Sequence, residues 1–187
     1  LIDYNVLVVD DESTDGTLET LKKFKKNNIK NIKKLGYEKT LIFGFKYIIK
    51  KYKKVKKIIT FDGDGEHKVK NLKKIIKEKN YDFIVGRRDK YFRTIELIIS
   101  KIFYFKSNIY DPLSGLKLYN VKILKLLNLD KYANLFLVDL AKDLTNKKIK
   151  FKNIKISTTK RTDNPRVGGL LNVNFKLIKI LLFSFFN

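Results

Sequence analysis

The stretch KIITFDGDGE, residues 57–66, decides the fold that the sequence predicts. An apolar run stops there at two carboxylates separated by a glycine, and the run VLVVDDESTDGT at residues 6–17 ends in the same way. Short apolar runs of this kind are typical of buried parallel strands, and ligands of open α/β sheets bind at the carboxyl edge of such strands. The two runs therefore predict a site for a divalent metal and a polyphosphate.

Strand and helix patterns alternate along the rest of the chain. Strands are expected at residues 5–10, 29–35, 56–61, 81–85, 116–119 and 151–156, and helices at residues 14–28, 38–53, 69–79 and 91–105, with two more after residue 119. This alternation predicts one α/β domain with a mostly parallel sheet over residues 1–169.

Residues 170–187 are strongly apolar but include Lys176 and Lys179. We expect an apolar C-terminal helix that lies at a membrane interface or begins a membrane segment. A helix packed on the sheet is the open alternative.

Composition narrows the classes of function. The 187 residues have a net charge of +23 and no cysteine, which excludes thiolate chemistry and a cysteine-based zinc site. Nearly all the positive charge is lysine, no nucleic-acid motif is present, and most aromatic residues have the spacing of helix cores. We therefore expect no nucleic-acid partner. Most of the lysine charge is expected on solvated faces, with an anionic membrane surface as a further partner. Since no secretory signal opens the chain, we expect a cytoplasmic protein that is peripheral on the cytoplasmic face of a membrane.

Asp62 and Asp64 can turn toward the same ion at a strand end, and Glu66 can add a third oxygen. Hard oxygen ligands suit Mg²⁺ or Mn²⁺, which keep open positions for phosphate oxygens. A calcium loop beginning at Asp62 is excluded because its twelfth position is Lys73, where a bidentate glutamate is needed. Two alternatives stay open: a plain surface turn, and a phosphatase in which Asp62 is the nucleophile and Asp64 the acid/base.

Three motifs in register, VDDESTDGT at 9–17, FDGDGEH at 61–67 and DPLSGLK at 111–117, resemble the family 2 glycosyltransferases of the GT-A fold. The most similar branch is the polyprenyl-phosphate (dolichyl-phosphate) mannosyl- and glucosyltransferase-like group, over about residues 5–170. The resemblance implies a Rossmann-like three-layer sandwich and a nucleotide-sugar glycosyltransferase. It also implies a UDP- or GDP-sugar donor and a polyprenyl phosphate or cell-envelope glycan acceptor.

The resemblance also assigns roles to residues. It implies nucleotide binding by Asp10, Asp11 and Asp62; metal binding by Asp62, Asp64 and Glu66; and phosphate or acceptor binding by Arg87, Arg88, Arg161 and Arg166. Such enzymes invert the anomeric centre, and a hydroxyl acceptor then needs a carboxylate base. Asp139 is the first candidate for that base and Asp111 the second, with a structural turn-forming role for Asp111 as the alternative.

The chain departs from the family pattern in places. The family's first strand is apparently lacking, so we expect an N-terminally incomplete GT-A domain. Glu96 lies where the resemblance leads us to expect a basic residue, and Arg93 is expected to compensate. The alternative function is therefore an inactive or fragmentary glycosyltransferase-like protein that acts as a basic binding or scaffold module.

Overall fold

The computed structural model describes residues 5–23, 28–132, 140, 143, 149–159 and 178. The chain forms two compact units. The first comprises Leu1–Val55 with Asn128–Asn134, and the second comprises Lys56–Leu127 with Leu135–Asn187. The expected single domain over residues 1–169 and its separate tail stay a prediction, and the tail lies outside the described residues except for Ile178.

The first unit is built on two parallel strands, β1 (Leu7–Asp10) and β2 (Asn28–Asn31). Its helices are α1 (Thr17–Lys22), α2 (Tyr37–Lys51) and the 3₁₀-helix η1 (Leu129–Tyr132). Helix α2 buries Ile42 and Phe45, three residues apart on one face, as the apolar spacing of this segment predicts. Helix α1 begins three residues later than expected, because Gly16 has a left-handed conformation that the helix cannot include.

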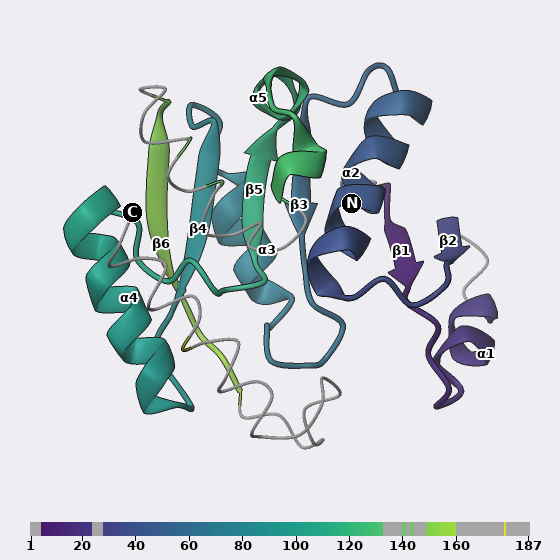
Figure 1. Ribbon diagram of the computed structural model, residues 1–187, viewed down its shortest axis with the longest axis horizontal. Coiled ribbons are helices and arrows are strands. Elements are labelled where there is room, and N and C mark those ends of the chain that lie inside the picture. The colour runs from purple at the N-terminus through teal and green to yellow at the C-terminus, as the bar shows by residue number, and fades with distance from the viewer. Residues whose placement is uncertain are drawn as a thin grey trace. The chain divides into compact units, whose positions relative to one another are not determined.

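The second unit holds a four-stranded sheet with the order β3-β5-β4-β6 (Figure 1). These strands are β3 (Lys57–Thr60), β5 (Lys117–Asn120), β4 (Phe83–Arg88) and β6 (Phe151–Ile156). Strand β5 is antiparallel to both β3 and β4, whereas β4 and β6 are parallel. Three of the four strands therefore point the same way, which confirms a mostly parallel sheet.

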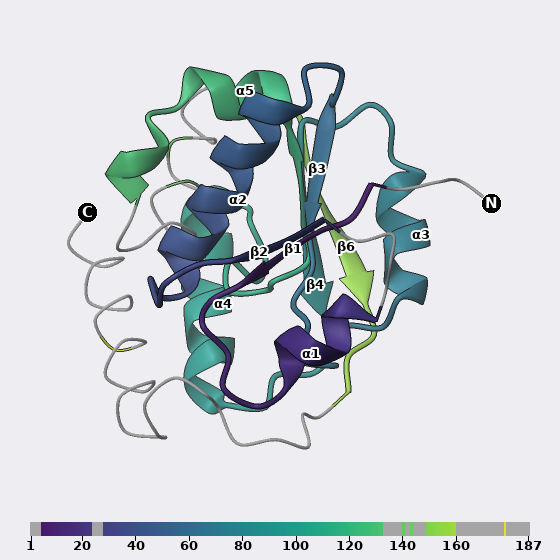
Figure 2. The ribbon, with the colours of Figure 1, turned by 90° about the vertical axis from the view of Figure 1, so that its right-hand side faces the viewer.

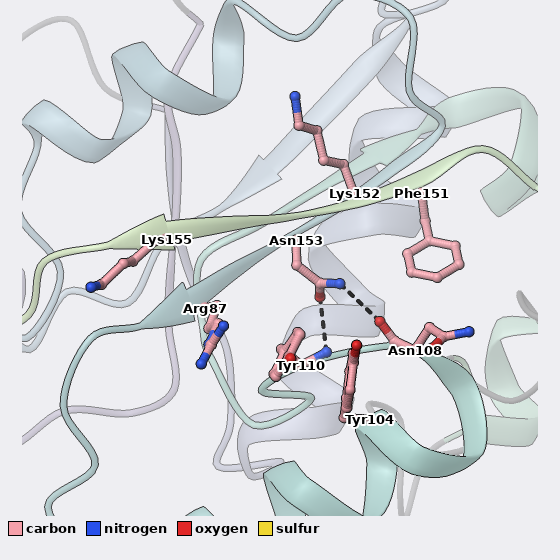
Figure 3. Close-up of a pocket in the computed structure, with 8 residues that line it drawn as sticks. All are labelled: Arg87, Tyr104, Asn108, Tyr110, Phe151, Lys152, Asn153 and Lys155. Atoms are coloured by element: carbon pink, nitrogen blue, oxygen red, sulfur yellow. Dashed lines mark hydrogen bonds between the residues drawn. The ribbon is translucent and has the colours of Figure 1, made fainter.

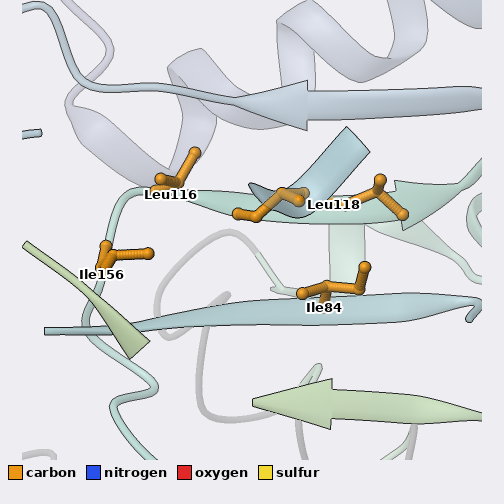
Figure 4. Packing of buried hydrophobic residues seen from close by; sticks show 5 residues of the cluster. Ile84, Leu116, Leu118 and Ile156 are labelled. Atoms are coloured by element: carbon orange, nitrogen blue, oxygen red, sulfur yellow. The ribbon is translucent and has the colours of Figure 1, made fainter. Parts of the chain in front are cut away.

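Helices cover both faces of this sheet (Figure 2). Helix α3 (Lys70–Ile76) lies on one side and α4 (Thr94–Ser107) on the other, and the short α5 (Val121–Leu126) follows β5 directly. The three layers are those expected of the fold. Five buried residues form the core between α3 and the sheet: Ile75, Ile84, Leu116, Leu118 and Ile156 (Figure 4).

Strand β4 is longer than the sequence predicts. Its expected end was residue 85, but Gly86, Arg87 and Arg88 continue the strand and pair in register with Ile154, Lys155 and Ile156 of β6. A Cβ at Gly86 would lie 2.9 Å from Ile156 Cδ1, so the close approach of the strands requires glycine there. Because side chains alternate along a strand, Arg87 and Arg88 point to opposite faces of the sheet.

Candidate functional site

The acidic turn after β1 is held by its own carboxylates. Asp11 accepts hydrogen bonds from the backbone amides of Leu35 (2.7 Å) and Gly36 (3.0 Å), so both of its oxygens fix the turn before α2. Asp10 is buried and accepts from the amide of Ser13 at 3.3 Å. These contacts give Asp11 a structural role. Nucleotide binding by Asp10 and Asp11 stays a prediction.

The second acidic turn follows β3 and is fixed from two directions. Asp64 Oδ1 accepts from the backbone amide of Glu66 at 3.0 Å, which closes the turn. Thr159, just beyond β6, donates its amide to the carbonyl of Glu66 (3.0 Å) and its hydroxyl to the carbonyl of Gly65 (2.9 Å). The turn that presents Asp62 and Asp64 is therefore anchored to a neighbouring segment rather than left as a free loop.

Asp62 lies directly against Gly115, in the turn before β5. A Cβ at Gly115 would overlap the carboxylate of Asp62, so any side chain here would have to displace that carboxylate. Thr60 Oγ1 donates to the carbonyl of Gly115 at 2.8 Å and holds the two segments together. Burial raises the pKa of Asp62, and the charge of Asp64 raises it further.

The carboxylates of Asp62 and Asp64 are oxygen donors that suit a divalent cation. Asp62 and Asp64 repel each other, and a hard cation between them would offset that repulsion with ligands of the kind Mg²⁺ and Mn²⁺ prefer. Among the described residues, no group of three or more histidine, cysteine, aspartate or glutamate side chains forms a metal cluster. Two protein carboxylates together with diphosphate oxygens would make the ligand set. His67 is buried beside this turn and makes an edge contact with Phe61.

Glu66, expected as the third metal ligand, faces Arg88 instead. Its Oε1 accepts from Arg88 Nη1 at 3.2 Å, so this carboxylate is already paired with a cation. Its metal-binding role stays a prediction, but the pairing favours Asp62 and Asp64 as the ligands.

Arg88 is the centre of a buried ion-pair network. Its Nε and Nη2 donate to Asp111 at 2.8 and 3.0 Å, and Nη1 also donates to Glu96 at 3.1 Å. The side chains of Arg88 and Asp111 are only 6% and 1% exposed. Every guanidinium nitrogen therefore already binds a carboxylate, and the phosphate-binding role expected of Arg88 would require breaking this network.

Asp111 matches the turn-forming alternative better than the role of base. It has a left-handed backbone (φ 50°), which aspartate tolerates better than most residues, and it also accepts from the backbone amide of Arg88 at 3.0 Å. A carboxylate engaged by one arginine through three nitrogens is poorly placed to take a proton from an acceptor. The catalytic assignment of Asp111 is untested.

Lys117 is a buried residue that sequence analysis did not single out. Its ammonium group donates to the carbonyl of Ser114, and burial lowers its pKa to about 7 despite the charges of Asp111 and Asp62. The only signal in the sequence is a lysine between Leu116 and Leu118 in an apolar strand. Gly115 was likewise missed as an individual residue, because nothing local shows that a distant carboxylate occupies its side-chain space.

Arg87 differs from Arg88 in its exposure and in having no carboxylate partner among the described residues. Its guanidinium lies 3.9 Å from the ring centroid of Tyr110, is exposed, and makes no hydrogen bond or ion pair with any residue that the structure describes. Stacking leaves the N–H edge of an arginine available for a phosphate. Of the two arginines expected to bind phosphate, Arg87 is the accessible one. Asp139, Arg161 and Arg166 lie outside the described residues.

Residues 1–145 match the family described as glycosyl transferase family 2. The chain belongs to this family. The match extends across both compact units and includes all three motifs, so the family resemblance of the sequence is confirmed. The polyprenyl-phosphate branch of the family is not established by this match.

Two further comparisons show what the chain is similar to in sequence and in fold. The chain is 38% identical over 87 residues to an uncharacterized protein of Methanocaldococcus jannaschii. The aligned residues cover 45% of this chain and 35% of that protein. The fold is similar to that of glucosyl-3-phosphoglycerate synthase from Mycobacterium tuberculosis in complex with phosphoglyceric acid. That structure has a TM-score of 0.66 and 12% identity, over 96% of this chain and 67% of the other. The same enzyme with Mn²⁺ and UDP-glucose gives a TM-score of 0.64 and 13% identity, over 95% and 67%.

Proposed function

We propose that this protein is a metal-dependent inverting glycosyltransferase that moves a sugar from a nucleotide-diphosphate sugar to a phosphate-bearing or glycan acceptor. The observation that carries the proposal is the pair Asp62 and Asp64, held at the end of β3 in a chain of glycosyl transferase family 2. The solved structures with a similar fold contain Mn²⁺ with UDP or UDP-glucose, which supports a divalent metal and a nucleotide-sugar donor.

The chemistry is a single displacement. The acceptor oxygen forms a bond to the anomeric carbon while the bond to the diphosphate breaks, so the configuration inverts and the nucleoside diphosphate leaves. Mg²⁺ or Mn²⁺ bound by Asp62 and Asp64 would neutralise charge on that diphosphate. Asp10 and Asp11 are the residues that we assign to the nucleotide.

The acceptor decides whether a base is needed. A hydroxyl acceptor must lose its proton to a carboxylate, for which Asp139 is the first candidate, whereas an acceptor phosphate is already anionic. Arg87, exposed and stacked on Tyr110, is the residue that we assign to the acceptor phosphate. A polyprenyl phosphate and a cell-envelope glycan are the two acceptor classes, and the site of action would be the cytoplasmic face of an anionic membrane.

Release of nucleoside diphosphate tests the proposal without knowledge of the acceptor. UDP- and GDP-sugars are incubated with the full chain and Mn²⁺ or EDTA, since slow transfer to water reports donor activation. We expect either the UDP-sugars or the GDP-sugars to be cleaved, in the samples with Mn²⁺ and not in those with EDTA. Asp64→Asn should lower the rate by at least about 100-fold, the scale of losing one transition-state charge contact.

The matched control is Asp130→Asn, the same chemical change at an exposed ion pair with Lys46 in the first unit. It should retain the activity of the unmodified chain. Equal activity in EDTA, or in Asp64→Asn, would overturn the metal-dependent mechanism. No cleavage of any donor would favour the inactive, glycosyltransferase-like binding module.

A further inference from the structure

Helix α4 exposes a row of large apolar side chains on the side away from its buried residues. Glu96, Ile99, Ser100 and Phe103 form its buried side. On the opposite side, Leu97, Ile98, Lys101, Tyr104 and Phe105 recur at the three- and four-residue spacing of one helical face. We call these five residues the α4 outer face. Phe105 is 93% exposed, and all the other members are exposed as well.

The charge on this helix is of one sign where it meets solvent. Lys101 and Lys106 are its exposed charged residues, while its single acid, Glu96, is buried and ion-paired with Arg88 and Arg93. Lysine stems can lie along an apolar surface while their ammonium groups reach outward. The α4 outer face thus combines apolar side chains with cations and no exposed carboxylate.

A cationic pocket adjoins this face and shares Tyr104 with it (Figure 3). The pocket has a volume of about 500 Å³, and no acidic residue is among the described residues that line it. Arg87 of β4 and Lys155 of β6 are directly opposed partners across the strands. Two cations on neighbouring strands attract an anion to this side of the sheet.

Ring stacking and hydrogen bonds hold the walls of the pocket together. The rings of Tyr104 and Tyr110 stack with their centroids 3.8 Å apart, and Arg87 packs on the other face of this stack. Asn153 of β6 accepts from the amide of Tyr110 at 2.9 Å and donates to the carbonyl of Asn108 at 2.8 Å. These bonds hold the end of α4 against β6, so the α4 outer face lies beside the strands that carry Arg87 and Lys155.

We propose that the α4 outer face docks on an anionic lipid bilayer. Leu97, Ile98 and Phe105 enter the boundary between headgroups and acyl chains, and Lys101 and Lys155 contact lipid phosphates. At 1.5 Å per residue the 14 residues of α4 extend about 21 Å, so the helix lies in the plane of the interface rather than across the roughly 30 Å hydrocarbon core. No helix among the described residues is long and apolar enough to cross a membrane.

This inference deepens the peripheral membrane location proposed above and rests on it. Its test uses neither metal nor nucleotide, so the donor-site proposal can fail or succeed independently.

The chain contains no tryptophan, so the fluorescence of one introduced tryptophan reports directly whether that position enters the bilayer. Phe105→Trp in the full chain is mixed with vesicles of phosphatidylcholine alone or with added phosphatidylglycerol. The emission should shift to the blue with the anionic vesicles and be quenched by lipids brominated on their acyl chains. The control, Leu126→Trp, replaces an apolar residue of α5 that is 73% exposed, and should show neither effect.

Flotation of the same vesicles measures how much the Phe105 side chain contributes to membrane binding. Phe105→Ser should lower binding to anionic vesicles about tenfold or more, the value of burying one aromatic side chain, while Leu126→Ser leaves it unchanged. If Phe105→Trp shows no shift while the chain still binds, attraction occurs elsewhere and the proposal is wrong. It is equally wrong if the chain binds neither vesicle, or if it is a dimer in solution that Phe105→Ser dissociates, because the face would then cover a second copy.

Discussion

At the scale of single residues, Arg87 and Arg88 show how adjacent arginines in one strand serve opposite purposes. Alternation along β4 directs Arg88 toward three carboxylates and Arg87 toward Tyr110 and solvent. Arg88 holds together the loop after β3, helix α4 and the turn before β5. Arg87 is available to an anion.

Removing the two arginine side chains should therefore have very different costs. Arg88→Met leaves Asp111 buried without its cation and leaves Glu96 with Arg93 alone, and we expect a loss of about 3–5 kcal/mol in the free energy of unfolding. Arg87→Met loses an exposed cation–π contact of about 0.5–1 kcal/mol. Urea denaturation of both variants measures this, and equal losses would contradict the buried network.

Gly115→Ala tests the packing of the Asp62 carboxylate against Gly115. Because the new methyl group would overlap the Asp62 carboxylate, we expect a loss of about 1–3 kcal/mol in stability and weaker metal-dependent nucleotide binding. Gly44→Ala is the control, since a Cβ at this position of α2 meets the side chain of Val9 in β1 at 3.5 Å, an ordinary van der Waals distance.

A double-mutant cycle separates this contact from general disruption. In an Asp62→Ala background the colliding carboxylate is gone, so Gly115→Ala should cost little there. A full loss of stability in that background would mean that Gly115 is required for another reason.

Lys117 predicts how stability depends on pH. Its pKa is about 7 in the folded protein and about 10.4 in an unfolded chain, so between these values the unfolded chain binds more protons. Stability should then rise with pH above about 7, by up to about 1.4 kcal/mol per pH unit from this residue. Below about pH 7 both states are protonated, and this residue contributes no slope.

Lys117→Met should remove that slope. Urea unfolding at several pH values between 7 and 9 compares the variant with the unmodified chain. Identical slopes would show that Lys117 keeps an ordinary pKa in the folded protein.

At the scale of elements, β3 could be predicted closely because its apolar run lies between lysines and the acidic turn. The bounds of β6 could be predicted because Phe151, Ile154 and Ile156 are the apolar residues of a stretch with lysine-rich segments on either side. The direction of β5 could not, because a four-residue strand has the same pattern whether it runs parallel or antiparallel to its neighbours. The extension of β4 through Arg88 was missed for a related reason. Two arginines look like a loop until their partners, Asp111 and Tyr110, are brought near by the fold.

The same limit applies to the candidate site. Asp62 and Asp64 are recognisable because they follow a strand directly. The pairing of Glu66 with Arg88, and the space at Gly115, depend on residues more than twenty positions away. A sequence without an alignment contains no local signal for either.

At the scale of the whole molecule, the central claim is that this chain of glycosyl transferase family 2 binds a nucleoside diphosphate through a metal at Asp62 and Asp64. Thermal unfolding with UDP, GDP and their sugars, in Mn²⁺ and in EDTA, tests it most directly. A ligand at about 100 times its dissociation constant should stabilise the folded chain by about 2.7 kcal/mol. We predict stabilisation by one nucleotide class, in Mn²⁺ alone, and its loss in Asp64→Asn but not in Asp130→Asn. Stabilisation that persists in EDTA or in Asp64→Asn, or none with any nucleotide, would contradict the claim.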